Sequence, residues 1–133
     1  MMYLLDTNIC IYAINGRSPN LSNRLFSITP DKIKVSAITV SELEYGAAKS
    51  HWGIKTHQIM HTFLASFDTL PFTEEDALCF GQLRALLSSK GTPVGLLDLM
   101  IAAQGISRNL TVVTHNTREF IRIPGIQLED WTE

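Results

Sequence analysis

The 133-residue sequence lacks an excess of basic residues, since 11 Lys and Arg stand against 13 Asp and Glu and the net charge is -2. This balance argues against a protein that holds nucleic acid mainly by bulk charge, a class that is typically basic. Cysteine is also scarce, because only Cys10 and Cys79 are present and they lie far apart. We therefore expect two free, buried thiols in a reducing compartment, not a disulfide scaffold.

Long apolar runs are missing as well. No run approaches the roughly 20 residues that cross a bilayer, and no basic stretch precedes an apolar one at the N-terminus. We therefore expect a cytoplasmic protein without a membrane partner. The sequence has no repeat, low-complexity tract or linker, and its 45% hydrophobic and 18% charged residues are typical of a globular chain. Residues 1–133 are thus predicted to form a single domain.

Short apolar segments alternate with segments of helical period. We expect strands at residues 2–5, 33–36, 69–72, 110–114 and 126–128. We expect helices at residues 8–14, 22–28, 55–67, 98–107 and 117–120, a helix that ends near residue 50, and one over residues 73–91. This alternation predicts an α/β fold with a short central parallel sheet of about 4–5 strands flanked by helices.

Polar residues mark the starts of two of these helices. Thr39 or Ser41 can cap the helix that ends near residue 50, which places Glu42 in its first turn. Thr73 and Asp76 have the spacing of a capping box.

Acidic and amide side chains gather after the expected strands. Asp6 follows the first strand, Glu42 lies in the helix after the second, and Asn116 and Glu119 follow the fourth. In parallel sheets, ligands bind outside the carboxyl ends of the strands. We therefore expect these residues near one cleft, and Asp98 opens a helix that could reach the same edge.

Three or four carboxylates cannot share a dry cleft as bare charges, because like charges repel and desolvation is costly. A Mg²⁺ or Mn²⁺ ion resolves both problems, and such ions can activate water for attack on a phosphodiester. Each acid also has a purely structural interpretation. Asp6 could cap a helix, Glu42 could be a solvated helix residue, and Asp98 could be favoured by the helix dipole.

Other candidate ligands are set aside. His57 and His61 lie four residues apart on a helix, but no Glu lies between them and no third ligand is evident, so no zinc site is expected. Glu44 is expected on a solvated face, His115 in a turn beside the cleft, and Trp52 and Trp131 in packing or an interface. The remaining acids are interpreted as turn or surface residues: Asp31, Asp68, Glu74, Glu75, Asp76, Glu129 and Asp130.

Four segments, taken in order, resemble the PIN-domain ribonucleases and, more narrowly, the VapC toxins of bacterial VapBC toxin–antitoxin modules. The segments are LLDTNICIY, SAITVSELEYGAAKS, GTPVGLLDLMIAAQGISRN and LTVVTHNTREF. The resemblance covers nearly the whole chain and implies a PIN fold with Mg²⁺- or Mn²⁺-dependent RNA cleavage.

The resemblance also implies an acidic quartet. It falls on Asp6, Glu42, Asp98 and a fourth position near Asn116, where many members carry Asp; either Asn116 or Glu119 could fill that role. Thr7, Asn8 and Thr114 are expected to orient these side chains. Arg84 and Arg118 are the first candidates for RNA contact, ahead of Arg17, Arg24, Lys49 and Lys90.

As partners, the resemblance implies a homodimer and a cognate VapB-type antitoxin. An antitoxin Arg would pair with the carboxylates, and the complex would bind operator DNA through the antitoxin. The expected substrate is tRNA, with the anticodon stem-loop of initiator tRNA as a specific possibility.

Two other functions stay open. One is a phospho-acceptor signalling domain, which would need a second acid beside Asp6 and a Lys after the last strand. The other is a non-catalytic PIN-like binding module, favoured only by Asn116.

Overall fold

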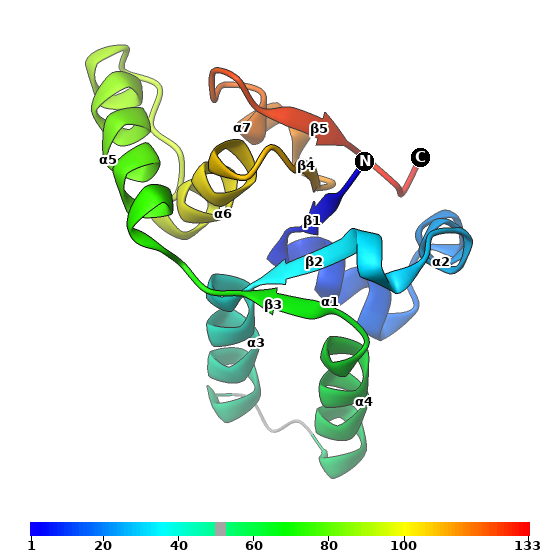
Figure 1. The fold of residues 1–133 in the computed structure, drawn as a ribbon. Helices are drawn as coiled ribbons and strands as arrows, with labels where there is room; N and C mark the ends of the chain where they lie inside the picture. The colour runs from blue at the N-terminus through cyan, green and yellow to red at the C-terminus, as the bar shows by residue number, and fades with distance from the viewer. Residues whose placement is uncertain (50–52) are drawn as a thin grey trace.

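The computed structural model describes residues 1–49 and 53–133 as an α/β fold. Its five strands form one sheet in the order β3-β2-β1-β4-β5, and all neighbouring strands are parallel (Figure 1). The predicted sheet is confirmed. The strands are β1 (Tyr3–Leu5), β2 (Ile33–Ser36), β3 (Asp68–Leu70), β4 (Thr111–Val113) and β5 (Gln127–Glu129).

Helices join and cover the strands, and each expected helix is present. Over the described part of the chain they are α1 (Thr7–Asn15), α2 (Pro19–Ser27), α3 (Ala37–Lys49), α4 (Ile54–Ala65), α5 (Glu74–Ser89), α6 (Leu96–Ser107) and α7 (Thr117–Phe120).

The sheet separates two apolar clusters because successive side chains of a strand point to opposite faces. In β1, Leu4 belongs to a cluster with Leu99 of α6, while Leu5 belongs to a second cluster with Ile9 of α1 and Met60 of α4. In Figure 1, α5, α6 and α7 accordingly lie on one side of the sheet, and α1 and α4 on the other. Each fully buried leucine stabilises this arrangement by about 1.5–3 kcal/mol.

The start of α3 differs from the sequence prediction. The helix begins at Ala37, directly after β2, so Thr39 and Ser41 lie inside it and Glu42 lies in its second turn. The Ser36 hydroxyl accepts a hydrogen bond from the Ile38 amide at 3.0 Å. This bond satisfies one of the free N–H groups at the start of the helix, and Ser36 supplies it in place of Thr39 or Ser41.

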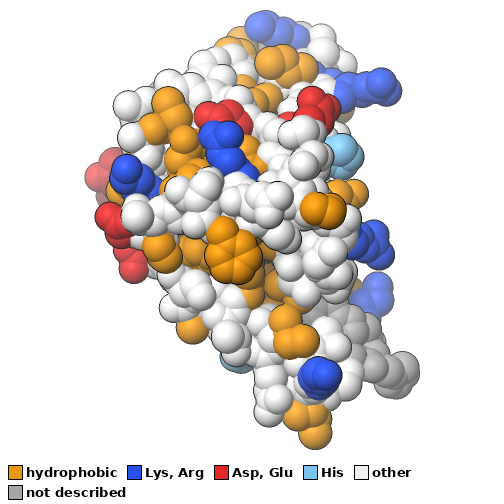
Figure 2. Space-filling model, turned by 90° about the vertical axis from the view of Figure 1, so that its right-hand side faces the viewer, with side chains coloured by type: hydrophobic (Ala, Val, Ile, Leu, Met, Phe, Trp, Pro, Cys, Tyr) orange, Lys and Arg blue, Asp and Glu red, His pale blue; other side chains and the backbone are white. Residues whose placement is uncertain are grey.

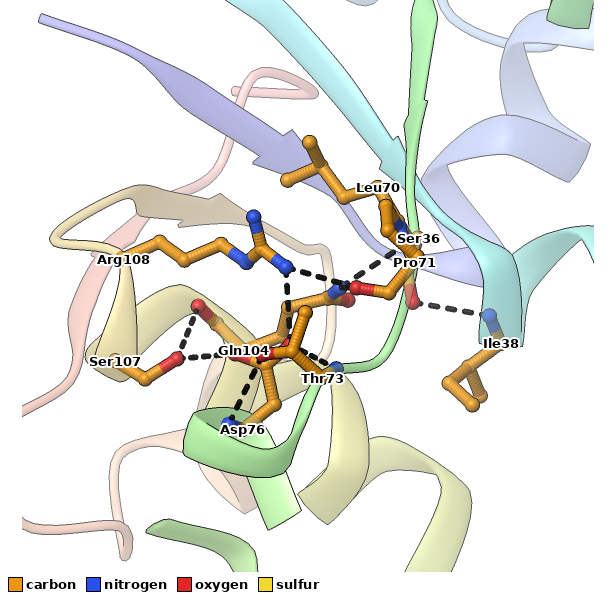
Figure 3. A network of polar contacts seen from close by, with 9 residues as sticks. All are labelled: Ser36, Ile38, Leu70, Pro71, Thr73, Asp76, Gln104, Ser107 and Arg108. Carbon is orange, nitrogen blue, oxygen red and sulfur yellow. Dashed lines mark hydrogen bonds and ion pairs between the residues drawn. The ribbon is translucent and has the colours of Figure 1, made fainter. Parts of the chain in front are cut away.

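The capping box at the start of α5 is confirmed, but Asp76 is wrongly interpreted as a turn or surface acid. Its side chain is 1% exposed and accepts hydrogen bonds from the Thr73 amide at 2.9 Å, from Arg108 at 3.1 Å and from the Ser107 hydroxyl (Figure 3). Burial alone would raise the pKa of Asp76, but these hydrogen bonds and the Arg108 charge together lower it.

The same network ties the C-terminal end of α6 to the connection between β3 and α5. Gln104 Nε2 donates to the carbonyl oxygens of Leu70 at 3.2 Å and Pro71 at 3.0 Å, and Arg108 donates to Pro71 at 2.8 Å (Figure 3). The network therefore helps to fix the position of α6, whose first turn carries Asp98.

Other expectations concern thiols, indoles and membranes. Cys10 and Cys79 are free, as predicted; Cys10 is buried, but Cys79 is only half-buried, contrary to the prediction. Trp131 is buried and packs edge-on against Tyr3 with ring centroids 4.9 Å apart, whereas Trp52 lies outside the described residues. None of the helices described is long and apolar enough to cross a membrane.

The glycine at position 105 allows α6 to lie close to β4. A Cβ at Gly105 would come within 2.6 Å of Val112 Cγ2 and 3.6 Å of the Leu110 carbonyl oxygen. Because these atoms belong to the core and the backbone, they have little room to move. Gly105 therefore helps to set the distance between α6 and the sheet.

We expect Gly105→Ala to lower the free energy of unfolding by about 1–3 kcal/mol, because the added methyl group overpacks this contact. Gly81→Ala is the matched control. Gly81 lies in α5 with no atom near its Cβ position, so alanine there should stabilise by up to about 1 kcal/mol. Urea unfolding of the three proteins measures both effects, and a Gly105→Ala protein as stable as the parent would contradict the close packing.

Candidate metal centre

The carboxyl ends of the parallel strands β1, β2 and β4 define the site. The register pairs Leu5 of β1 with Val35 of β2 and Val113 of β4, so these strands end at the same level. The Asp6 amide continues the ladder by donating to the Val113 carbonyl oxygen at 3.0 Å. The segments that follow the strands therefore meet at one edge, as expected of a parallel sheet.

Asp6 is buried at this edge, with 1% of the residue exposed. It caps α1 by accepting a hydrogen bond from the Ile9 amide at 2.8 Å. Burial raises the pKa of Asp6 to about 6, helped by the charges of Glu42 and Asp130, while hydrogen bonds from Thr114 and Ile9 oppose the rise. Asp6 is thus a helix cap, and its charge also lacks a counter-ion.

Glu42 of α3 is held by a threonine next to Asp6. The Thr7 hydroxyl donates to Glu42 Oε1 at 2.6 Å and lies 3.1 Å from the Thr39 hydroxyl. The structure therefore places Thr7 against Glu42, one of the candidate ligands. Thr39 is an additional member of this network, which the sequence pattern indicated only as a helix cap.

Asp98 lies in the first turn of α6 beside Glu119 of α7. Burial raises the pKa of Asp98 to about 6, and the Glu119 carboxyl and the charges of Asp6 and Glu42 add to the rise. The Gly95 amide donates to Glu119 Oε1 at 3.0 Å. A Cβ at Gly95 would lie 3.6 Å from Glu119 Oε1 and 3.7 Å from Asp98 Oδ2, so both carboxylates border the same glycine.

Asn116 is turned toward Glu119. Its side-chain amide donates to Glu119 Oε2 at 2.6 Å, and its backbone amide donates to the Thr114 hydroxyl at 2.9 Å. The carboxylate next to Asp98 is therefore that of Glu119, and Asn116 orients it. The structure does not bring Asn8 into this network, because its side chain is exposed and makes no hydrogen bond to the described residues.

Asp130 is a residue of this edge that the sequence interpretation missed. It follows β5 directly, lies close enough to influence the pKa of Asp6, and contacts His115 Nδ1 at 3.1 Å. Burial would raise the pKa of Asp130, but hydrogen bonds from Thr132 and His115 lower it. Its position after an expected strand was the available signal, since the same rule selected Asp6.

Cations do not neutralise the site. Among residues 1–49 and 53–133, no Lys or Arg forms an ion pair with Asp6, Glu42, Asp98 or Glu119. Of the candidate RNA contacts, Arg84 and Arg118 are exposed on α5 and α7. The others interact locally: Arg24 with Glu129, Arg17 with the Tyr12 ring and Lys49 with the Tyr45 ring, while Lys90 is the exposed C-cap of α5.

This donor set fits a hard divalent cation. It consists of carboxylate oxygens. Neutral groups orient these oxygens through hydrogen bonds but do not neutralise their charge. Mg²⁺ and Mn²⁺ prefer oxygen ligands of this kind. Asp6, Glu42 and Asp98 could hold such an ion, with Glu119 as a further oxygen donor. A bound cation would also make an acidic cleft attractive to phosphate.

The chain is similar to known proteins along nearly its whole length. A family model described as PIN domain matches residues 3–126. The tRNA(fMet)-specific endonuclease VapC of Salmonella typhimurium is 42% identical over 131 residues, 98% of each chain. Ribonuclease VapC2 of Rickettsia felis is 39% identical over 132 residues, also 98% of each. A crystal structure of VapBC2 from Rickettsia felis, bound to a promoter DNA fragment, matches with a TM-score of 0.92 at 38% identity, over 98% of this chain and 99% of that chain.

We expect Asp6→Asn to stabilise the metal-free protein at pH 7.5 by about 1–3 kcal/mol, because asparagine keeps the helix cap without the buried charge. The pKa of Asp6 rises from 3.8 to about 6 on folding, so the protonated form is favoured in the folded state. The stability that this preference contributes is complete below pH 3.8 and is lost as the pH rises through about 6.

Thermal and urea unfolding in EDTA between pH 4.5 and 8 measure this effect. The loss of stability across that range should be smaller in Asp6→Asn than in the parent. Asp31→Asn, at an exposed position before β2, is the matched control and should not stabilise. An Asp6→Asn protein that is less stable than the parent at pH 7.5 would show that the charge of Asp6 is compensated.

Proposed function

Since the chain belongs to the VapC ribonucleases of the PIN-domain family, we propose that it hydrolyses RNA phosphodiesters with a divalent cation held by Asp6, Glu42 and Asp98. The observation that carries this proposal is that these carboxylates lie close enough for their charges to raise the pKa of Asp6 and Asp98, without a Lys or Arg ion pair among the described residues. We further propose that residues 1–133 act as one PIN domain.

Each residue of the cleft has a stated task in this proposal. A Mg²⁺ or Mn²⁺ ion, when bound, supplies an activated water nucleophile and stabilises the charge that develops on the leaving oxygen. Thr7 fixes the carboxylate of Glu42, and Thr114 donates a hydrogen bond to Asp6. The Gly95 amide and Asn116 hold Glu119 beside Asp98. Because water attacks instead of the ribose 2′-hydroxyl, the products carry a 5′-phosphate and a 3′-hydroxyl.

The proposed substrate is tRNA, and initiator tRNA in particular. This proposal is supported by the name of the Salmonella relative, which specifies tRNA(fMet). Arg84 and Arg118 are exposed near the cleft, and Arg84 lines a hollow that also includes Gly95. We propose that these two arginines contact phosphate groups on either side of the cut, as guanidinium groups commonly do.

A VapB-type antitoxin and a second copy of the chain are the proposed protein partners. The solved relative from Rickettsia felis is a VapBC2 complex on promoter DNA, which supports an antitoxin that carries the operator contacts. Figure 2 shows hydrophobic side chains over the face that carries α2 and α4, where Phe26 is 91% exposed. In the antitoxin complex, we propose that an arginine pairs with the carboxylates of the cleft in place of the metal.

The two rival functions gain no support. The binding-module hypothesis relied on Asn116, a neutral residue where a fourth acid was expected. The Glu119 carboxylate lies next to Asp98 at this position, and Asn116 donates a hydrogen bond to it. A phospho-acceptor domain would need a second acid next to Asp6 in the sequence and a Lys after the last strand. The residues at those two positions are Thr7 and Asp130.

The proposed activity predicts that purified, antitoxin-free protein cuts initiator tRNA with Mg²⁺ or Mn²⁺ and that EDTA abolishes the cuts. Asp98→Asn should lower the rate by about 100-fold or more, because it removes a metal ligand. End mapping should give 5′-phosphates. Asp31→Asn, before β2 and away from the carboxyl edge, should cut normally.

Two results would contradict the proposal. Intact RNA throughout, from protein shown to be folded by circular dichroism, would favour a binding role. Cuts that persist in EDTA would mean that the carboxylates do not act through a metal.

Glu119, and not Asn116, is the proposed fourth oxygen donor. We therefore expect Glu119→Gln to raise the Mg²⁺ concentration for half-maximal cleavage about tenfold, and Asn116→Ala to raise it less, because Asn116 acts through Glu119. Mg²⁺ titrations of cleavage by both variants measure this order. A larger effect of Asn116→Ala would assign the fourth position to Asn116.

A further inference from the structure

Three side chains with metal-binding atoms meet outside the carboxylate cleft, between α3 and α4. They are Glu44 of α3 and His57 and His61 of α4, and one ligand atom of each lies within 4.8 Å of the others. Glu44 supplies the third donor that the sequence pattern did not reveal beside the two histidines. Its side chain is 45% exposed, which agrees with the solvated face that the sequence predicts and leaves the carboxylate accessible to an ion.

The packing of the two helices explains this meeting. His57 and His61 are one helical turn apart and therefore share a face of α4. Met60 and Leu43, which are buried next to His61 and Glu44, hold both helices against the same apolar cluster. The backbone positions of the three donors are thus set by the core, while their side chains remain partly exposed.

The distances fit one small ion. His61 Nε2 lies 3.0 Å from Glu44 Oε1, His57 Nε2 lies 3.9 Å from Glu44 Oε2, and the imidazole centroids are 4.6 Å apart. Ligand atoms around a tetrahedral Zn²⁺ with bonds of about 2.0–2.1 Å are separated by about 3.4 Å. The observed separations lie on both sides of this value, and partly exposed side chains can adjust by rotating.

We propose that Glu44, His57 and His61 form a binding site for Zn²⁺ or a similar late first-row divalent ion. Two imidazole nitrogens and one carboxylate oxygen are a common zinc donor set, and a water molecule can fill the fourth position. Mg²⁺ avoids such a set because it prefers oxygen ligands and an octahedral shell. The site therefore selects a different ion from the carboxylate cleft.

A bound ion would link α3 to α4. The two helices are joined through residues that lie outside the described ranges, and the three donors provide a contact between them that does not depend on the core. Because α3 also carries Glu42, the ion would stabilise the helix on which part of the cleft is built.

The test is calorimetric titration of the untagged 133-residue protein with Zn²⁺ in excess Mg²⁺, so that Mg²⁺ competes for the oxygen-only cleft. We expect one equivalent of Zn²⁺ to bind. His57→Gln and His61→Gln should each weaken binding at least about tenfold, since each removes one of three protein ligands. At a Zn²⁺ concentration about 100 times the Kd, the melting temperature of the parent protein should rise by about 5 °C or more.

Two control variants separate this site from other histidines and from the cleft. His115→Gln removes an imidazole beside Asp130, and Asp98→Asn removes a carboxylate of the cleft; both should keep Zn²⁺ binding. Co²⁺ in place of Zn²⁺ should give visible d–d absorption that is lost in His61→Gln. The proposal is overturned if Zn²⁺ does not bind, or if binding survives both histidine substitutions; loss of binding in Asp98→Asn would place the ion in the carboxylate cleft instead.

Discussion

The parallel pairing of β1 with β2 on one side and β4 on the other is the constraint on which the molecule depends. Because all three strands point the same way, the segments that leave them begin at one edge of the sheet. The connecting helices must return antiparallel to the strands, which brings the first turn of α6 to that edge as well. A central strand has no solvent-exposed side, so the carboxylate that follows β1 is buried.

Burial then concentrates negative charge in a small volume. The donors that contact these carboxylates are neutral: the Ile9 amide for Asp6, the Thr7 hydroxyl for Glu42, and the Gly95 amide for Glu119. Neutral donors orient a carboxylate but do not neutralise it. The raised pKa values of Asp6 and Asp98 show that their charged forms are unfavourable in the folded protein. A bound divalent cation would make these charged forms favourable.

Asp76 shows the other way of burying a carboxylate. It is as buried as Asp6, but Arg108, Ser107 and Thr73 lower its pKa, so its charge is compensated within the protein. Asp76 therefore serves to hold α6 in place, whereas Asp6 is left available to an ion. Burial alone does not distinguish a structural acid from a site acid; the charge of its partners does.

The helix α3 carries a candidate ligand for each of the two proposed metal sites. Glu42 lies in the oxygen-only cleft, and Glu44 lies against two imidazoles.

Local patterns in the sequence were sufficient to find the strands, the helices and the capping box of Thr73 and Asp76, though not the start of α3, because periodicity and capping act within a few residues. The rule that parallel strands end at one edge was sufficient to select Asp6, Glu42 and the alternatives Asn116 and Glu119 as candidates, and to allow Asp98 to reach that edge. Partners distant in sequence could not be predicted: Arg108 for Asp76, and His61 for Glu44. Such pairs depend on which helices pack side by side, and that is settled by burial of the whole core, not by any local pattern.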